Sequence, residues 1–452
     1  MPISSFGAKL LAETAPKLRE QVVKRGEKQT AGKIAGDLLK LDRKAIDGLG
    51  RDAVGLIKKF DAKLKASNPT ELALKYKNMA ISPRRFLTGQ PELMMYDMRE
   101  LAQNLGAQTV VQGDMHMHNI AVMRSYKGKL KIRPNDFDEA TIGPAALDFN
   151  RLATHIVLTG REKKLGAKET QKLVEKFAAS YHDTMSELAK HPGQKVHVEK
   201  PQAIKDLLKR AEGTDPLKWI EKRAPKAHGV RMLERDATRL DVSGTLKQQV
   251  IDAVDVYRGK LEPATKKSLQ GYKVTDVVKV VQGTGSMGRP RYRVLLERGK
   301  DEPIILQLKA QEAAPLERLG LTKTTYRSEA ERNLALSSLM DGNLDGFRGT
   351  TQTKGLPGDF LVERVRAEDD FLNVNEMSAK DLKQVSEFYG TVAAKGHAHG
   401  ADAGLASAKD ILATLGSKQA FVDGLVDFAH QYADQTERDY SGFMKALKQN
   451  AL

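Results

Sequence analysis

The chain of 452 residues has no cysteine and a single tryptophan. Without cysteine it can form no disulfide, thiolate zinc site, iron–sulfur cluster or thiol nucleophile, so any metal must be held by oxygen or nitrogen ligands. Apolar runs of the ~18 residues that a membrane helix needs are absent, and the N-terminus lacks the apolar block of a signal peptide. We therefore expect a cytoplasmic protein without a membrane span, although a leaderless export route would leave no signal in the sequence.

The composition is that of an ordinary globular protein, with 40% hydrophobic and 29% charged residues. The length is about three times a modal domain of ~150 residues, which favours two lobes. Lysine and arginine number 74 against 58 acidic residues, for a net charge of +16. This excess favours acidic partners such as nucleotides, nucleic acid or anionic lipid, and it does not choose among them.

Hydrophobic periodicity divides the chain into four segments of an α+β protein. Residues 1–80 are basic with helical spacing, and residues 81–270 are mostly helical around short strands and polar loops. Residues 271–366 alternate strand-like runs with turns, which predicts a small lobe with a mainly antiparallel sheet. Residues 367–452 are helical again, and we expect them to pack on the larger, helical lobe.

A polar loop with the sequence GDMHMHN follows a short β-branched run. Such a loop can direct the carboxylate of Asp114 at a substrate hydroxyl, while the amide oxygen of Asn119 coordinates a hard divalent cation. Asp136 ends the next strand-like segment and could take Mg²⁺ from the other side. Each signal is weak alone, because Asp and Asn in polar loops commonly form turns or helix caps.

A glycine-rich segment, Gly283-Thr-Gly285-Ser-Met-Gly288, follows the run VVKVVQ. This spacing serves both dinucleotide folds and kinase loops, since glycine lets backbone N–H groups approach phosphate oxygens. A dinucleotide fold needs a helix next, whereas Pro290 and RYRVLLE predict a strand, so the glycines form the tip of a β-hairpin. Lys309 on the next strand could pair with phosphates, or be an exposed strand lysine.

In a kinase-like site, a glutamate on the following helix holds that lysine toward the phosphates. Glu329 and Glu331 both qualify, but two positions apart on a helix they point to opposite sides. We favour Glu329 for the pair with Lys309. The alternative is that both are solvated helix charges.

The histidines offer a competing interpretation. His116 and His118 form an H-x-H after a strand, which also opens the metal site of barrel-type hydrolases. That fold requires repeated βα units, whereas this chain has a helical block and then antiparallel-looking strands. We therefore favour packing of His116 within the loop, and packing or surface positions for His397 and His399.

Taken together, these motifs resemble the protein kinase-like superfamily, in particular its aminoglycoside-phosphotransferase-type branch. Its loop H-G-D-x-H-x-x-N, strand I-D-F-x-x-A and helix D-x-x-R-L-A correspond here to GDMHMHN, NDFDEA and GPAALDFNRLA. The chain resembles more closely the uncharacterised bacterial family called domain of unknown function 2252, over about residues 80–405. The segments RRFLTG and AKGHAHGAD and the late glycine hairpin add to this likeness.

The resemblance implies roles for individual residues. Asp114 would be the catalytic base, Asn119 and Asp136 the Mg²⁺ ligands, and Asp138 a possible further ligand. The phosphates of ATP would be covered or positioned by Gly283, Gly285, Ser286, Gly288, Lys309 and Glu329. Asp148 and Arg151 would anchor the catalytic loop.

In this chain the catalytic loop precedes the glycine hairpin, which is the reverse of the order in ordinary kinases. The resemblance therefore implies a two-lobed, circularly permuted kinase-like fold, since permutation at surface termini can preserve packing. Either the helix expected at 91–105 or that at 379–399 could support the catalytic loop.

The function expected is an ATP- and Mg²⁺-dependent phosphotransferase acting on an unidentified hydroxyl acceptor, a small molecule or a protein. The alternatives are a nucleotidyl transferase that transfers AMP and a nucleotide-binding interaction protein without catalysis. Nucleic-acid binding through the basic N-terminal segment is not favoured, because aromatic residues do not interleave with its charges.

Overall fold

The computed structural model describes residues 51–103, 107–125, 128–193, 196–197, 199–300, 302–322, 326–341 and 345–452. Most of the basic N-terminal segment therefore lies outside the described residues. Its last part forms α3 (Ala53–Ser67) and α4 (Pro69–Met79). Asp52 and Asn68 accept hydrogen bonds from backbone N–H groups of the first turns, which satisfies donors that a helix start leaves free.

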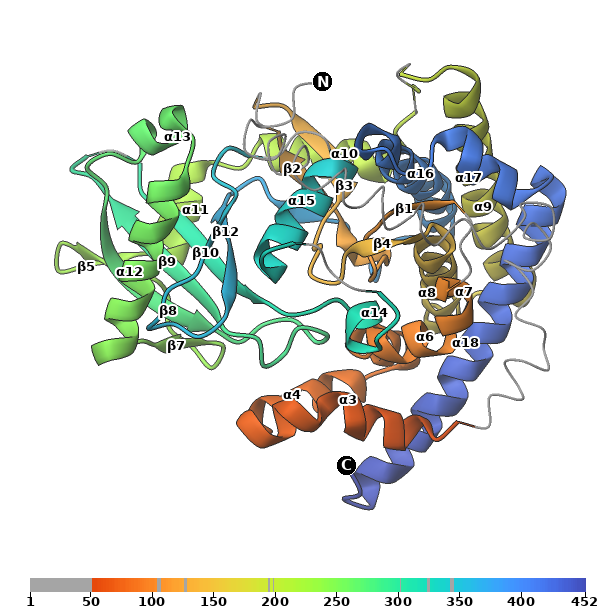
Figure 1. Cartoon of the computed structure of the whole chain (residues 1–452), viewed down its shortest axis with the longest axis horizontal. Helices are drawn as coiled ribbons and strands as arrows, with labels where there is room; N and C mark the ends of the chain where they lie inside the picture. Colours follow the sequence, from red (N-terminus) through yellow and green to blue (C-terminus); the bar gives the residue numbers. More distant parts are fainter. Residues whose placement is uncertain are drawn as a thin grey trace.

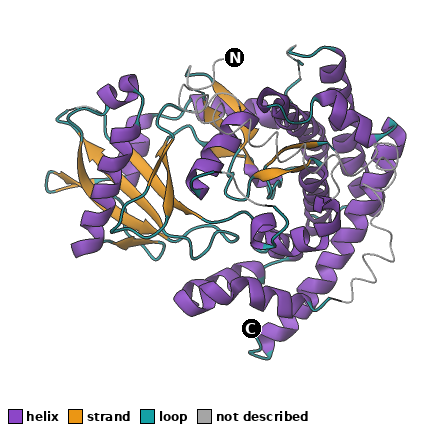
Figure 2. Cartoon of the chain, viewed as in Figure 1, coloured by secondary structure: helices purple, strands orange, loops and turns teal. Residues whose placement is uncertain are grey.

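A six-stranded antiparallel sheet forms the β-rich part of the molecule (Figures 1 and 2). Its order is β11-β12-β10-β9-β8-β7, with β7 (Arg239–Asp241), β8 (Lys273–Val280), β9 (Arg291–Glu297), β10 (Ile304–Gln311), β11 (Gly349–Thr351) and β12 (Asp359–Val365). In β10, Leu306 packs in one buried cluster with Val254 of α12 (Gly244–Lys260), and Ile305 in another with Ile220 of α11 (Pro216–Arg223). Successive residues of one strand thus face helices on opposite sides of the sheet, and the antiparallel sheet expected from the sequence is confirmed.

The other end of the molecule is helical (Figure 2). Its principal helices are α8 (Ala146–Glu162), α9 (Ala167–Lys190), α16 (Ala379–Ala398), α17 (Ala408–Leu415) and α18 (Lys418–Lys448). Helices α9 and α16 approach closely at Gly390, where a Cβ atom would lie 2.3 Å from the carbonyl oxygen of Phe177. The largest buried hydrophobic cluster joins these helices to two small sheets, so the C-terminal helices pack on the helical part.

Two small sheets pack with the helical part, and the remaining elements are short. The first sheet pairs β1 (Gln108–Val111) with β4 (Thr141–Pro144), and the second has the order β13-β2-β3, with β2 (Ile120–Arg124), β3 (Leu130–Pro134) and β13 (Asp370–Phe371). A minor hairpin joins β5 (Lys226–Ala227) and β6 (Val230–Arg231). The other elements are α5 (Pro83–Gly89), α6 (Pro91–Asp97), α7 (Arg99–Gln103), η2 (Met117–Asn119), α10 (Gln202–Glu212), α13 (Pro263–Ser268), α14 (Pro315–Arg318), α15 (Glu329–Asp341) and η3 (His399–Ala403).

Two helix expectations can be compared with the structure. The predicted helix at 379–399 is present as α16, with Ser378 and Asp381 forming the expected capping box. The single helix predicted at 91–105 is wrong, because the segment breaks into α6 and α7 at Met98, whose backbone angles (φ −88°, ψ 13°) leave the helical region. The glycine cap proposed at Gly106 lies outside the described residues. None of the helices in the described ranges is long and apolar enough to span a bilayer.

Helices α3 and α4 contact both parts of the molecule (Figure 1). Glu71 of α4 pairs with Lys279 of β8 at 2.7 Å, which ties α4 to the six-stranded sheet. Tyr76 of α4 packs edge-on against Phe443 of α18, with ring centroids 5.5 Å apart. The two helices therefore link the sheet to the C-terminal helix.

Candidate functional site

The loop after β1 is fixed by the first turn of α8. The carboxylate of Asp148 accepts hydrogen bonds from the backbone N–H groups of Gln112 (2.6 Å) and Gly113 (2.9 Å). Gly113 has a φ of +81°, and a Cβ atom there would lie 2.0 Å from the carbonyl oxygen of Glu139. Only glycine fits this position without strain, and the turn delivers Asp114 to the start of the loop.

Asp114 is held by a buried arginine. Its Oδ1 atom accepts a hydrogen bond from Nε of Arg151 at 2.6 Å and forms an ion pair with Nη2 at 2.5 Å, and the Arg151 side chain is completely buried. Arg151 also donates to the carbonyl oxygen of Leu87 at 3.0 Å. Burial raises the pKa of Asp114 to about 7, against the opposing effect of Arg151. A carboxyl group that titrates near neutral pH is suited to accept a proton.

Asn119 and Gln112 lock the far end of this loop. The side-chain amide of Asn119 donates to the carbonyl oxygen of Asp114 at 2.9 Å. The side-chain amide of Gln112 donates to three backbone carbonyl oxygens, those of Asn119 (3.2 Å), Asn135 and Asp136 (3.3 Å). Sequence reasoning missed Gln112, whose only signal is its position directly before the Gly-Asp pair.

Asp136 and Asp138 lie in the loop after β3, and the structure brings them together with Lys309 of β10. Lys309 Nζ is 2.8 Å from Asp136 Oδ1 and 2.6 Å from Asp138 Oδ2. Burial opposes ionisation of Asp136, but Lys309 outweighs it and lowers the pKa of this carboxyl group. The Asp136 side chain remains 40% exposed, whereas that of Asp138 is 5% exposed. Asp136 also has a positive φ of 62°, a strained conformation of the kind that clusters at functional sites.

Further polar groups surround Asp138. Its Oδ1 atom accepts a hydrogen bond from Gln311 at 3.0 Å, and its Oδ2 atom lies 3.4 Å from the guanidinium of Arg289. Arg289 in turn pairs with Glu139 at 2.5 Å. The buried carboxylate of Asp138 is thus stabilised by Lys309, Gln311 and Arg289, whereas the more exposed carboxylate of Asp136 depends mainly on Lys309.

The expected pair between Lys309 and Glu329 is not formed. Glu329 instead accepts a hydrogen bond from Arg332 at 2.6 Å, one turn along the same helix. Helix α15 begins at Glu329, which places its side chain within reach of the residue three positions on. Glu331 is also in the first turn, and its backbone N–H donates to Ser328 Oγ at 3.2 Å.

Arg332, which sequence reasoning missed, joins the acidic loop to the sheet. Its side chain is 1% exposed and donates to the carbonyl oxygens of Asp138 (2.8 Å), Glu312 (2.9 Å) and Ala140. In the sequence, a glutamate followed three positions later by an arginine on a helix is equally typical of an exposed ion pair. The pattern therefore did not indicate that Arg332 is buried.

The glycine hairpin joins β8 to β9 as expected, and its tip is packed against other elements. Gly283 and Gly288 have φ values of +89° and +87°, which favour glycine. A Cβ atom on Gly288 would lie 2.2 Å from Leu64 of α3, and one on Gly285 would lie 3.1 Å from the carbonyl oxygen of Thr88. The hairpin tip thus lies against α3 and the end of α5, a placement that sequence reasoning did not anticipate. Ser286 Oγ accepts a hydrogen bond from Arg291 at 3.3 Å.

The histidines are placed largely as expected. His116 is buried, and its Nδ1 atom accepts a hydrogen bond from the backbone N–H of His118 at 3.2 Å. His397 is fully buried between Asp148 (3.1 Å) and the hydroxyl of Tyr181 (2.8 Å). The exposed His399 lies beside Asp402. The paired strands in the described part of the chain are antiparallel, which excludes a βα barrel built from them.

No curated protein and no solved structure gives a significant match to the chain. The family model described as "Uncharacterized protein conserved in bacteria (DUF2252)" matches residues 67–446, which is well over half of the chain. The protein therefore belongs to this family of uncharacterised bacterial proteins.

Proposed function

We propose that the protein is an ATP- and Mg²⁺-dependent phosphotransferase with a circularly permuted, two-lobed protein kinase-like fold. The observation that carries this proposal is the contact of Lys309 with both Asp136 and Asp138. Lys309 and Asp136 are 173 positions apart in the sequence, yet their charged atoms lie 2.8 Å from each other. A lysine on the strand after a glycine hairpin that meets the acidic loop matches the strand lysine and the metal-binding aspartate of kinase-type phosphoryl transfer.

Asp114 is the proposed base. Both contacts with Arg151 use Oδ1, and Oδ2 lies 3.8 Å from His116 Nε2, beyond hydrogen-bond distance. Oδ2 can therefore accept the proton of a bound hydroxyl group. Arg151 would keep the carboxyl group oriented while the proton is transferred.

The acidic loop supplies the oxygen ligands that Mg²⁺ prefers. The half-exposed carboxylate of Asp136 is accessible, and Asn119 donates its side-chain nitrogen to the carbonyl oxygen of Asp114, a bond that does not use its side-chain oxygen. Asp138 adds a second carboxylate, which lies 2.6 Å from Lys309. When bound, Mg²⁺ would neutralise charge on the phosphates of ATP. Asp136 and Asn119 would hold the metal, and Lys309 would pair with phosphate oxygens.

The position of α16 supports the permuted order. This helix follows the six-stranded sheet in the sequence, yet Tyr389 donates a hydrogen bond to the carbonyl oxygen of Met117 in the catalytic loop at 3.2 Å. His397, near its end, contacts the Asp148 carboxylate that anchors the loop. Helix α6 contributes less, through Met94 Sδ, 3.7 Å from Arg151. Of the two candidate supports, α16 thus makes the direct contacts.

The proposal is tested by adding ATP and Mg²⁺ to the full chain and measuring its thermal midpoint. We expect ATP with Mg²⁺ to raise the midpoint, because a ligand that binds only the folded state stabilises it. Asp136→Ala should lose most of this shift, whereas Asp183→Ala, an exposed aspartate on α9, should keep it. An unshifted wild-type protein at saturating nucleotide and metal would contradict the proposal.

Catalysis is tested by incubating labelled ATP and cell extract with the wild type and with Asp114→Asn. Label transferred by the wild type alone identifies the acceptor, and mass spectrometry of the product separates an added phosphate from an added AMP. Addition of AMP would assign nucleotidyl transfer to this site. Binding of ATP without transfer in any fraction would favour the non-catalytic alternative.

A further inference from the structure

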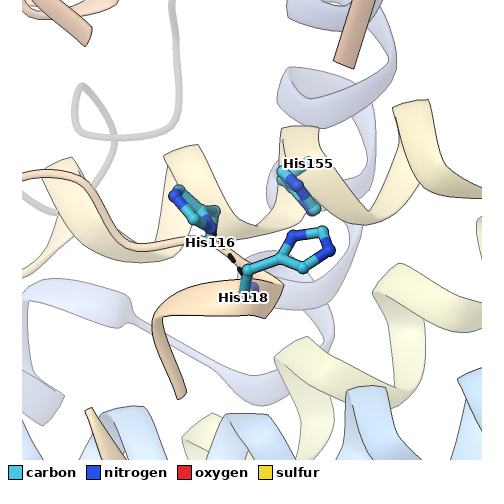
Figure 3. A group of neighbouring side chains, drawn as sticks. All are labelled: His116, His118 and His155. Carbon is cyan, nitrogen blue, oxygen red and sulfur yellow. Dashed lines mark hydrogen bonds between the residues drawn. The ribbon is translucent and has the colours of Figure 1, made fainter. Parts of the chain in front are cut away.

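A cluster of three histidines lies beside the catalytic loop. His116 and His118 come from the loop and η2, and His155 comes from the facing side of α8 (Figure 3). One ring nitrogen from each lies within 4.8 Å of those of the other two. The rings of His116 and His155 are stacked with centroids 5.3 Å apart, and the ring of His118 meets His155 edge-on at 5.7 Å.

His155 carries an unpaired polar atom into this cluster. Its side chain is completely buried, and its Nε2 atom has no hydrogen-bond partner among the described residues. The other ring nitrogen, Nδ1, lies 3.4 Å from the hydroxyl of Thr159. Buried polar atoms are nearly always paired, so an unpaired nitrogen on a ring beside two more imidazoles points to a site for a ligand.

Three guanidinium groups, those of Arg84, Arg85 and Arg151, lie near the cluster and oppose a bound cation. Burial lowers the pKa of His116, His118 and His155. Neutral imidazole is the form that binds metal ions. Two of these three guanidinium groups are compensated, because Arg84 pairs with Glu162 and Arg151 with Asp114.

We propose that His116, His118 and His155 form a binding site for a divalent transition-metal ion such as Zn²⁺, separate from the oxygen-lined magnesium site. Imidazole nitrogen selects Zn²⁺ and its neighbours, whereas Mg²⁺ prefers oxygen ligands. Three histidines leave the fourth tetrahedral position to a water molecule. Water can reach the cluster at His118, which is partly exposed.

Binding requires small local movements. Bonds of about 2.05 Å in a tetrahedral site place ligand nitrogens about 3.3 Å apart, so the rings must approach from their present spacing. His118 is the only member of the three that is not buried, and its ring is therefore the freest to turn. His116 either exchanges its bond with the backbone of His118 for the metal, or binds through Nε2 with its proton on Nδ1.

The ion would join η2 to α8. Asp114 and Asn119 flank the two loop histidines in the sequence, so the metal would fix the backbone between the proposed base and the proposed Mg²⁺ ligand. This role is structural and does not depend on the reaction proposed for the protein.

The test uses the full-length protein, freed of metal with a chelator and then titrated with Zn²⁺ or Co²⁺. We expect about one ion per chain to remain after dialysis, and the visible spectrum of bound Co²⁺ to have the intensity of a tetrahedral site. His155→Gln and His118→Gln should each weaken binding at least about tenfold. His399→Gln removes an exposed histidine outside the cluster and should leave binding unchanged.

Far-UV circular dichroism checks that each variant is folded. Since His155 is fully buried, its replacement can disturb folding, and His118→Gln alone then decides the question. The proposal is overturned if the wild type retains no metal after dialysis, or if the folded variants bind Zn²⁺ as tightly as the wild type. It is equally overturned if His399→Gln is the variant that loses the ion.

Discussion

Lys309 places one ammonium group between two carboxylates, 2.6 Å from Asp138 and 2.8 Å from Asp136. The side chain of Asp138 is almost fully buried, whereas that of Asp136 is 40% exposed. The pair of Lys309 with Asp138 is therefore part of the buried interior, whereas its pair with Asp136 is accessible to solvent. Loss of the lysine should affect both stability and ligand binding.

For Lys309→Met we expect the free energy of unfolding to fall by about 1–3 kcal/mol, since Asp138 loses a charged partner but keeps Gln311 and Arg289. We also expect the thermal shift caused by ATP and Mg²⁺ to disappear. Urea unfolding and thermal shift measure the two effects. Lys273→Met, at an exposed position of β8, is the control. A variant that binds ATP like the wild type would remove Lys309 from the proposed site.

The pH dependence of transfer should report Asp114, because burial raises the pKa of this carboxyl group to about 7. A base must be ionised to accept a proton, so kcat/KM should rise with pH and reach half of its plateau near pH 7. The measurement is the rate of ATP consumption between pH 5 and 9. Asp114→Asn should abolish the activity at every pH. A rate that is flat between pH 5 and 8 would contradict the assigned role.

Arg332 should be essential for folding, because its buried guanidinium donates to three backbone carbonyl oxygens and to Glu329. We expect Arg332→Ala to lower the free energy of unfolding by about 3 kcal/mol or more, since several buried acceptors lose their donor at once. The control is Arg210→Ala, which removes a surface pair worth about 1 kcal/mol or less. Denaturant titration compares them, and equal losses would argue against the bridging role.

Gly288 should resist substitution for two separable reasons. In Gly288→Ala the new Cβ meets Leu64, and the φ of +87° adds backbone strain, so we expect a loss of about 1–3 kcal/mol. Gly299→Ala has a positive φ and open space around it, and therefore measures the backbone effect alone. Leu64→Ala should recover part of the loss, which a double-mutant cycle detects. Additive effects of the two changes would show that the hairpin tip and α3 are not in contact.

The sequence predicted local structure well where a residue dictates the backbone around it. Pro290 and the alternating run after it indicated a strand, so the glycines were correctly placed at the tip of a hairpin between β8 and β9. The helix after Ser378 was predicted from its capping pair and is present. The helix expected at 91–105 failed because periodicity does not register the local break at Met98.

Partners across long sequence separations were harder to predict. The motif spacing predicted that Lys309 and Asp136 lie in one site, and the two are in contact. It also predicted a pair between Lys309 and Glu329, whereas Glu329 binds Arg332. A motif contains no information on where the helix begins or which residue a neighbouring arginine binds. Gln112 and His155 were missed for a related reason: each acts through contacts with segments that periodicity does not link to it. Their roles follow only from the packing of α8 and the two small sheets around the loop.

Helix α3 has a consequence for any shortened form of this protein. The family match begins at residue 67, yet Arg51, just ahead of that helix, holds the buried carboxylates of Asp97 and Asp439. A protein trimmed to the matched boundaries would lack Arg51, so the buried carboxylates of Asp97 and Asp439 would lose their positively charged partner. It would also lack Leu64, which packs against Gly288 of the glycine hairpin. Such a fragment would therefore differ from the intact protein in stability and in the support of the glycine hairpin, because the removed residues pack against that hairpin.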